Sequence, residues 1–410
     1  VQNNIIGSIT SSGSNSNQAN SITGISTGGS GTFTVSSNSI GNSTPENLKV
    51  GCYQTSGNLS NTGSPIAVSG TMLPFVGIEA SSSLGNISIT GNTIQGMANN
   101  TFACQSVGID VSTSGSILGP NVSVQTNTIG NASTGWLHFR INQGSNLFGI
   151  KISEVSTGTP ATFTVSDNNF TGITTESGIT HGGINMISIF GSGSDNVNIT
   201  NNLFSNLQLK NGIGLISSSY NITGNCTHTV SNNRIVGGLI INGNGGFAGI
   251  ASSTNLPTGM VIYSNNDFSN IQLNGTGDMS GMVGQFINGS PTRTITGNTF
   301  TNWQTNGLIE GISINAFSGA LSSISNNSLK NLSAGTGFTG IQLGDPSLGR
   351  DGNASLLEVS NNEVGQISSA TGNITGIINY VPSTVVNIEN NLVHDFSGGA
   401  LIEESSAKSG

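Results

Sequence analysis

Three ionisable residues occupy the same place in a repeated sequence pattern, and together they could bind a ligand or transfer a proton. Glu79, Asp110 and Lys151 each follow a Gly-Ile pair, and Asn185 follows the next such pair along the chain. If these pairs stack on one another, Glu79 and Asp110 form a pair of carboxylates, the arrangement that cleaves glycosides or binds calcium ions. The alternative is a surface ion pair between Asp110 and Lys151, which would contribute little to stability.

A second group with unusual chemistry is the segment TGWLHFRINQGS, residues 134–145. Trp136, His138 and Arg140 lie close together within it. Aromatic rings stack on sugar rings, and a guanidinium group binds a carboxylate through two parallel hydrogen bonds. We therefore expect this segment to be able to contact an acidic polysaccharide. The alternative is a loop whose aromatic rings cover the side of the protein.

The remaining reactive residues form no recognisable site. His181, His228 and His394 are far apart in the sequence and have no metal-ligand spacing. The three cysteines are too few for a disulfide framework and lack zinc spacing. Cys52 and Cys104 could form one bridge, or all three could be buried as small apolar side chains. We predict no metal site and no cofactor, and we assign no catalytic residue.

The composition excludes some classes of partner. Only 9 residues are Lys or Arg against 18 Asp or Glu, which gives a net charge of −9. Such a chain has no basic stripe to displace counterions, so we predict no nucleic-acid partner. We also predict no membrane span, because the sequence has no run of 18 apolar residues. A surface of small polar residues with few charges indicates an extracellular or cell-surface location.

The elements that would position these residues come from a nine-residue pattern, exemplified by VSDNNFTGI at residues 165–173. The pattern reads apolar, two small polar residues, Asn, any residue, apolar, any residue, usually Gly or Asn, apolar. Successive copies are typically 29–35 residues apart, with two longer steps of 54 and 41 residues. The twelve copies centre on Asn4, Asn38, Asn92, Asn127, Asn168, Asn202, Asn233, Asn266, Asn298, Asn327, Asn362 and Asn391.

These copies predict short strands rather than helices. Apolar residues alternate with polar ones within each copy and around the Gly-apolar pairs between copies, and helical periodicity is absent. A five-residue strand cannot bury its face alone, but stacked copies can. The sequence therefore predicts an all-β, single-stranded, right-handed parallel β-helix of about twelve coils, forming one domain over residues 1–410. His228 and Arg293 replace apolar residues of the pattern and predict local distortions or register changes.

The repeated Asn is expected to point inward at a corner of each coil. Stacked Asn side chains hydrogen-bond from coil to coil and form a ladder. Such a ladder would pair turn carbonyls that would otherwise be buried without a partner.

The twelve Asn-centred copies resemble the right-handed parallel β-helix repeat family, which includes pectate-lyase-like enzymes, phage tailspikes and large secreted bacterial surface proteins. The resemblance covers essentially the whole chain and implies the fold, but that fold hosts lyases, hydrolases, adhesins and stalks. Polysaccharide lyases of this fold usually have several acidic calcium ligands together with a catalytic Arg or Lys. This sequence has no such dense cluster.

The two long steps predict loop insertions near residues 43–71 and 134–145. The first copy starts at Val1, and the last is followed by another strand-like segment, which predicts uncapped ends and self-association through them. We therefore expect an extracellular structural or adhesive protein, either a filament subunit stacked end to end or a segment of a giant surface protein. The alternatives are a carbohydrate-active enzyme, either a polysaccharide lyase or a glycoside hydrolase, and a non-catalytic carbohydrate-binding module.

Overall fold

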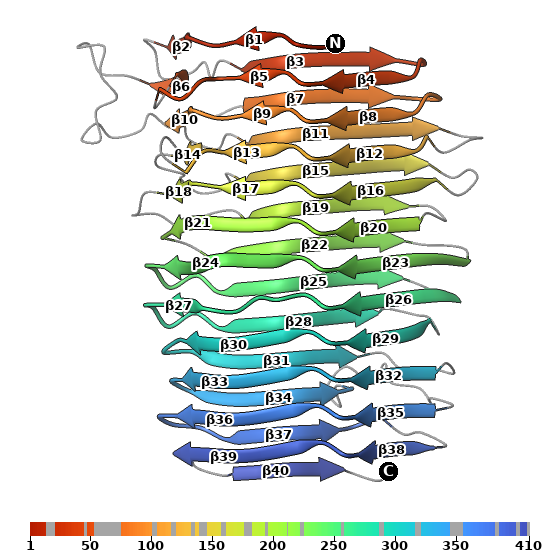
Figure 1. The fold of residues 1–410 in the computed structure, drawn as a ribbon, viewed down its shortest axis with the longest axis vertical. Coiled ribbons are helices and arrows are strands. Elements are labelled where there is room, and N and C mark those ends of the chain that lie inside the picture. The colour runs from red at the N-terminus through yellow and green to blue at the C-terminus, as the bar shows by residue number, and fades with distance from the viewer. Residues whose placement is uncertain are drawn as a thin grey trace.

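The computed structural model describes residues 1–13, 21–44, 47–52, 75–100, 105–115, 120–132, 136–138, 146–156, 161–175, 183–192, 196–210, 212–221, 225–255, 258–286, 291–315, 321–344, 356–381, 385–398 and 402–407. Within these ranges every regular element is a β-strand, and strands of successive coils pair in parallel. Three sheets form the walls of one solenoid, whose strands lie across its long axis (Figure 1). The predicted parallel β-helix is confirmed.

The first wall is a sheet of twelve strands. They are β3 (Ile22–Gly29), β7 (Phe75–Ser82), β11 (Ser106–Gly115), β15 (Leu147–Ser156), β19 (Ile184–Ser192), β22 (Ile213–Asn221), β25 (Phe247–Asn255), β28 (Met279–Phe286), β31 (Leu308–Asn315), β34 (Gly337–Leu343), β37 (Ile374–Asn379) and β40 (Ile402–Ala407).

The second wall is a sheet of eleven strands. They are β4 (Phe33–Ser36), β8 (Ile87–Thr90), β12 (Val122–Gln125), β16 (Thr162–Ser166), β20 (Asn196–Thr200), β23 (Asn225–Ser231), β26 (Thr258–Ser264), β29 (Thr292–Thr296), β32 (Leu321–Ser325), β35 (Leu356–Ser360) and β38 (Val386–Glu389).

The third wall is a sheet of seventeen strands. The chain bends within this wall, and in the early coils the bend divides the segment into two short strands. The short strands are β1 (Ile5–Ile6), β2 (Ile9–Gly13), β5 (Ser39–Ile40), β6 (Leu48–Cys52), β9 (Thr93–Ile94), β10 (Met97–Asn100), β13 (Thr128–Gly130), β14 (Trp136–His138), β17 (Asn169–Thr171), β18 (Ile173–Thr175) and β27 (Ile271–Leu273). The longer ones are β21 (Leu203–Leu209), β24 (Arg234–Ile241), β30 (Thr299–Gln304), β33 (Ser328–Ala334), β36 (Glu363–Ser369) and β39 (Leu392–Gly398).

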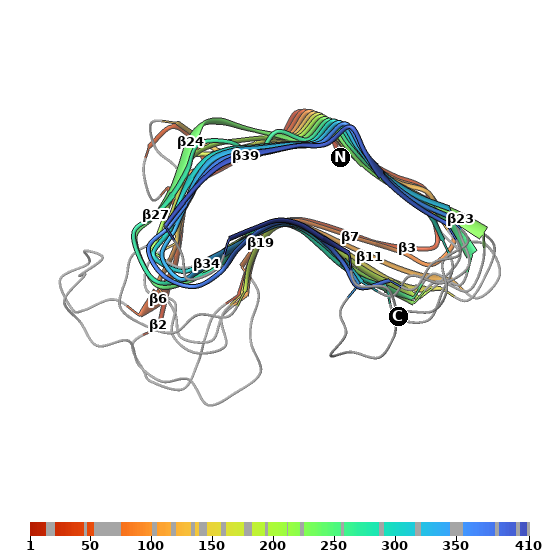
Figure 2. The same cartoon turned by 90° about the horizontal axis from the view of Figure 1, so that it is seen from below.

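Each coil runs from the first wall to the second and then to the third. Followed from the N-terminus to the C-terminus in Figures 1 and 2, the coils wind as a right-handed helix. Seen along the axis, the cross-section is a crescent, with the first wall curving inward (Figure 2).

Residues with a left-handed backbone conformation form the corner between the second and third walls. The residue directly before each repeated Asn has a positive φ, for example 57° at Asp167 and 59° at Asn201. A second bend follows four residues after that Asn, with φ of 51° at Asn206 and 59° at Asn302. Asn and Asp tolerate this conformation better than most residues because their short side chains can bond locally. The small polar residues of the repeat are therefore corner residues.

The predicted Asn ladder is confirmed. In each of its eleven steps the Asn Nδ2 donates to Oδ1 of the next Asn at 2.9–3.0 Å. Asn298 shows the full pattern. Its Oδ1 accepts from both the backbone N–H and Nδ2 of Asn266, and its Nδ2 also donates to the Tyr263 carbonyl at 2.9 Å. The ladder thus holds successive corners in register.

One continuous apolar core fills the space between the walls. The inward residues include stacked rings such as Phe170 and Phe204, whose centroids are 5.1 Å apart. The Gly-apolar pairs of the first wall face this stack. A Cβ at Gly149 would lie 2.4 Å from the Phe170 ring and 2.5 Å from the Met186 carbonyl oxygen. Glycine is therefore required where the first wall packs against the aromatic rings of the third wall.

The two predicted insertions are only partly described, and the described parts differ from the expectation. Leu48–Cys52 and Trp136–His138 are strands β6 and β14 of the third wall rather than loops. Leu48 is buried in the core, and β14 pairs with both β10 and β18. These segments continue a wall because each coil must supply a strand there. Residues 45–46, 53–71, 134–135 and 139–145 of the two predicted insertions lie outside the described residues.

Candidate functional site

The charged residues of the first wall stack as the sequence predicts, with one correction. Asp110 pairs in register with Glu79 on one side and Lys151 on the other. Lys151 is followed by Ser188, whereas Asn185 pairs with Phe148 and is not part of this column. The register is set by the strands, and the Gly-Ile pair before Asn185 lies three residues too early. We call Glu79, Asp110 and Lys151 the charged column.

The charged column is held by short polar contacts. The Lys151 Nζ lies 3.5 Å from the Asp110 Oδ2, and each side chain is 20% exposed. The Glu79 Oε2 accepts a hydrogen bond of 3.1 Å from the Ser26 hydroxyl. Lys151 also lies over the Phe148 ring, at 5.9 Å from its centroid. The lysine is therefore shared between a carboxylate and an aromatic face.

Burial makes Asp110 a weaker acid than a free aspartate. Partial burial raises its pKa, the charge and hydrogen bond of Lys151 oppose that shift, and the nearby Glu79 carboxylate adds to it. Three residues before the column, Val76, Val107 and Phe148 form a small buried cluster separate from the main core. Asp110 therefore lies between a lysine and a second carboxyl group, next to a small apolar cluster. Among the described residues there is no group of three or more side chains suited to hold a metal ion.

The aromatic segment of the sequence lies on a different wall. Trp136 and His138 belong to β14 in the third wall, whereas the charged column lies on the first wall. Arg140 lies outside the described residues. The described residues therefore do not combine the two groups into one site, and polysaccharide binding by them remains a prediction.

The cysteines are described in part. Cys52 ends β6, and Cys104 lies outside the described residues, so the predicted bridge stays a prediction. Cys226 is buried in β23 of the second wall.

Two charged or titratable residues of the second wall point into the core. His228, Val261 and Arg293 follow one another in a column whose register is unbroken, so the expected distortions at His228 and Arg293 are wrong. His228 and Arg293 are each 1% exposed. The His228 ring meets the Tyr263 ring edge-on, with centroids 5.7 Å apart. Burial lowers the pKa of His228 to about 4 and raises the pKa of Tyr263. The interior accepts the imidazole as a neutral group.

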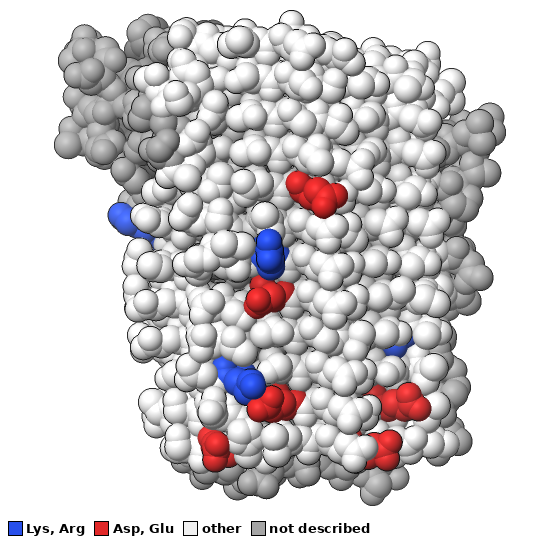
Figure 3. All heavy atoms as spheres, viewed as in Figure 1, with Lys and Arg blue, Asp and Glu red and all other residues white. Residues whose placement is uncertain are grey.

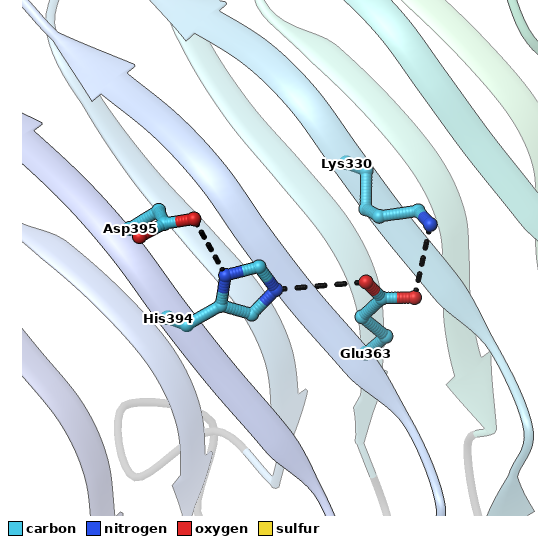
Figure 4. A network of polar contacts seen from close by, with 4 residues as sticks. All are labelled: Lys330, Glu363, His394 and Asp395. Atoms are coloured by element: carbon cyan, nitrogen blue, oxygen red, sulfur yellow. Dashed lines mark hydrogen bonds and ion pairs between the residues drawn. The ribbon is translucent and has the colours of Figure 1, made fainter.

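A surface network ties together the last coils of the third wall (Figure 4). Glu363 contacts the Lys330 Nζ at 3.0 Å and the His394 Nε2 at 3.5 Å, and His394 contacts Asp395 at 2.8 Å. The hydrogen bond with Asp395 raises the pKa of His394, burial opposes that shift, and Glu363 adds to it. This face carries few charges: some blue and red groups lie side by side, and others lie apart from any opposite charge (Figure 3).

Sequence reasoning missed a groove on the outer side of the third wall. It has a volume of about 390 Å³ and lies where β24 has one more residue than β21. The extra residue is part of Gly237-Gly238, which replaces the single corner residue of neighbouring coils. Exposed amide side chains line it, namely Asn206, Gln208, Asn270, Gln272, Asn302 and Gln304. The Gly237-Gly238 pair, which stands where each neighbouring coil has a single Asn, is the sequence feature that could have indicated this groove.

The described residues contain no helix that is long and apolar enough to cross a membrane.

No protein-family model, no curated protein and no solved structure matches the chain.

Proposed function

We propose that the chain is an extracellular structural or adhesive β-solenoid in which coil-on-coil stacking continues beyond its two end coils. The carrying observation is that coil-on-coil stacking, through parallel strand pairing in three walls and the Asn ladder, is how the described coils bury their apolar residues. Ile6 in the first coil is partly exposed, whereas its partner Ile40 is 0% exposed. In the last coil Phe396 is partly exposed, whereas its partner Ile367 is 1% exposed.

The two ends are chemically complementary. The Asn ladder directs its donors toward later coils, so Asn391 presents its backbone N–H and Nδ2 at one end. Asn4 presents its Oδ1 acceptor at the other end. Parallel strand edges at both ends would continue the three walls in the same register. A head-to-tail contact of this kind generates a filament when it does not close into a ring.

The experiment is sedimentation of the 410-residue chain over a range of concentrations, combined with negative-stain electron microscopy. We expect concentration-dependent rods one solenoid wide. Phe396→Asp should abolish them, because it places a charge on the open core end. Val236→Asp is the matched control, since Val236 is an exposed apolar residue on the side of the body.

Monomers at every concentration would reject stacking between copies, and with it the filament form of the proposed role.

The in-register charged column favours a second candidate, a carbohydrate-active enzyme. Two carboxyl groups in register, Asp110 with a raised pKa beside Glu79, are the kind of pair that cleaves glycosides. Degradation of an acidic polysaccharide that is lost in Asp110→Ala but retained in Lys330→Ala would replace the structural role with this one.

A further inference from the structure

The groove on the third wall arises because one coil lacks a side chain that its neighbours have. Asn206 and Asn270 occupy the second bend of the coils on either side, with φ of 51° and 63°. Between them the chain passes through Gly237 and Gly238, with φ of 79° and 90°. A Cβ at Gly237 would meet no atom within 4 Å. The missing side chain leaves open space beside Gly237, and Figure 2 shows β24 and β27 standing out from the stack of ribbons.

The side chains around the hollow are suited to hydroxyl groups. Gln208, Ile240, Gln272 and Gln304 follow one another in register, one strand spacing apart or about 4.8 Å. Each amide offers a donor and an acceptor, as a sugar hydroxyl does. Ile240, which is 43% exposed, places an apolar surface between two of these amides, where the C–H face of a sugar ring could pack. Among the described residues, none that lines the groove is charged.

Hydrogen bonds already fix the direction of several of these amides. The Asn302 Nδ2 donates to the Asn270 Oδ1 at 2.7 Å, and the Gln272 Nε2 donates to the Asn274 Oδ1 at 2.8 Å. Side chains held in this way lose less freedom when a ligand binds. The volume of about 390 Å³ falls within the range of about 300–1,000 Å³ that is typical of small-ligand sites.

A glycan fits this surface better than a peptide does. A peptide binds a sheet most readily by adding a strand to an open edge. Here the backbone groups of β21, β24, β27 and β30 are already paired with neighbouring coils. What remains available is a row of amide side chains at a regular spacing, which matches a polymer of repeating hydroxyl-bearing units.

We propose that this groove binds a neutral glycan chain, lying along the solenoid axis across β21, β24, β27 and β30. The site is lateral and does not depend on end-to-end stacking, so its failure and the failure of the proposed assembly can be told apart. A charged polysaccharide is disfavoured because the lining offers no counter-charge.

The test uses the full chain and a panel of neutral hexasaccharides: cellohexaose, maltohexaose, laminarihexaose, xylohexaose, mannohexaose and N-acetylchitohexaose. Binding is measured by saturation-transfer NMR and calorimetry. We expect at least one member to bind. Gln208→Ala and Gln272→Ala should each weaken it about three- to tenfold, as expected for the loss of one or two hydrogen bonds. Gly237→Asn should remove binding, because its side chain fills the hollow.

The matched control is Gln366→Ala, an exposed amide with φ of 58° at the same bend in a later coil, outside the groove. It should bind as the parent does, and thermal melting should confirm that all variants are folded. The proposal is overturned if no panel member binds, or if Gly237→Asn binds as tightly as the parent. It is also overturned if an Asn- and Gln-rich peptide binds the groove and none of the sugars does.

Discussion

Replacing His228 with valine should remove one defined source of acid sensitivity from the fold. His228 is buried in the second wall between two valines of the neighbouring coils, Val197 and Val261. Valine is therefore the residue type at the equivalent position in both neighbouring coils. The folded protein holds the pKa of His228 at about 4, whereas an unfolded histidine titrates near about 6.5.

The direction of the effect follows from which state binds the proton. Between pH 6.5 and 4 the unfolded chain protonates at this position and the folded protein does not, so stability falls as pH falls through this window. A difference of about 2.5 pKa units corresponds to about 3 kcal/mol, since each unit is worth about 1.4 kcal/mol. Below pH 4 both states are protonated and the loss levels off.

The measurement is urea denaturation of the parent and of His228→Val at several pH values from 7.5 to 4. Titration of the other groups is common to both proteins and cancels in the difference between them. The parent should lose about 3 kcal/mol more than the variant across this range. Equal losses in the two proteins would refute a neutral buried imidazole, whatever the absolute stability of the variant at pH 7.5.

Three further predictions concern the ladder, the corners and the charged column. Asn298→Leu should cost about 1–3 kcal/mol for each partner left unpaired, seen as a lower denaturation midpoint; an unchanged midpoint would reject the inward ladder. Asn201→Val should cost about 1–2 kcal/mol because Asn201 has φ of 59°, while Asn201→Gly should be nearly neutral; equal effects would show that the corner is unstrained. Lys151→Met should raise the pKa of Asp110 further in an NMR titration, because it removes the charge that opposes the effect of burial; a lower pKa would contradict this account.

The fold could be predicted from the sequence because every coil repeats the same pattern of inward apolar residues and a corner Asn. Asn298 and its counterparts could be assigned an inward position because an apolar residue such as Phe300 follows each at a spacing of two. The order of Glu79, Asp110 and Lys151 was predicted for the same reason.

The details that failed are those in which the strand register, rather than the local sequence, decides the outcome. Asn185 follows a Gly-Ile pair, yet the strand places Ser188 beside Lys151. Trp136 lies in extra length that local reasoning treats as a loop, whereas pairing with Ile173 makes it part of a wall. The groove was missed because it is defined by an absent side chain, which only the neighbouring coils reveal.

The direction of the hydrogen bonds also determines how the body would respond to force. Bonds between coils run along the long axis, and each coil is tied mainly to the next one (Figure 1). A pull on its two ends would therefore load the coils in series and open them one after another. A coil of 29–35 residues releases up to about 100–120 Å of extended chain, at about 3.5 Å per residue. Under tension such a body would lengthen in steps and dissipate energy, rather than break at a single interface.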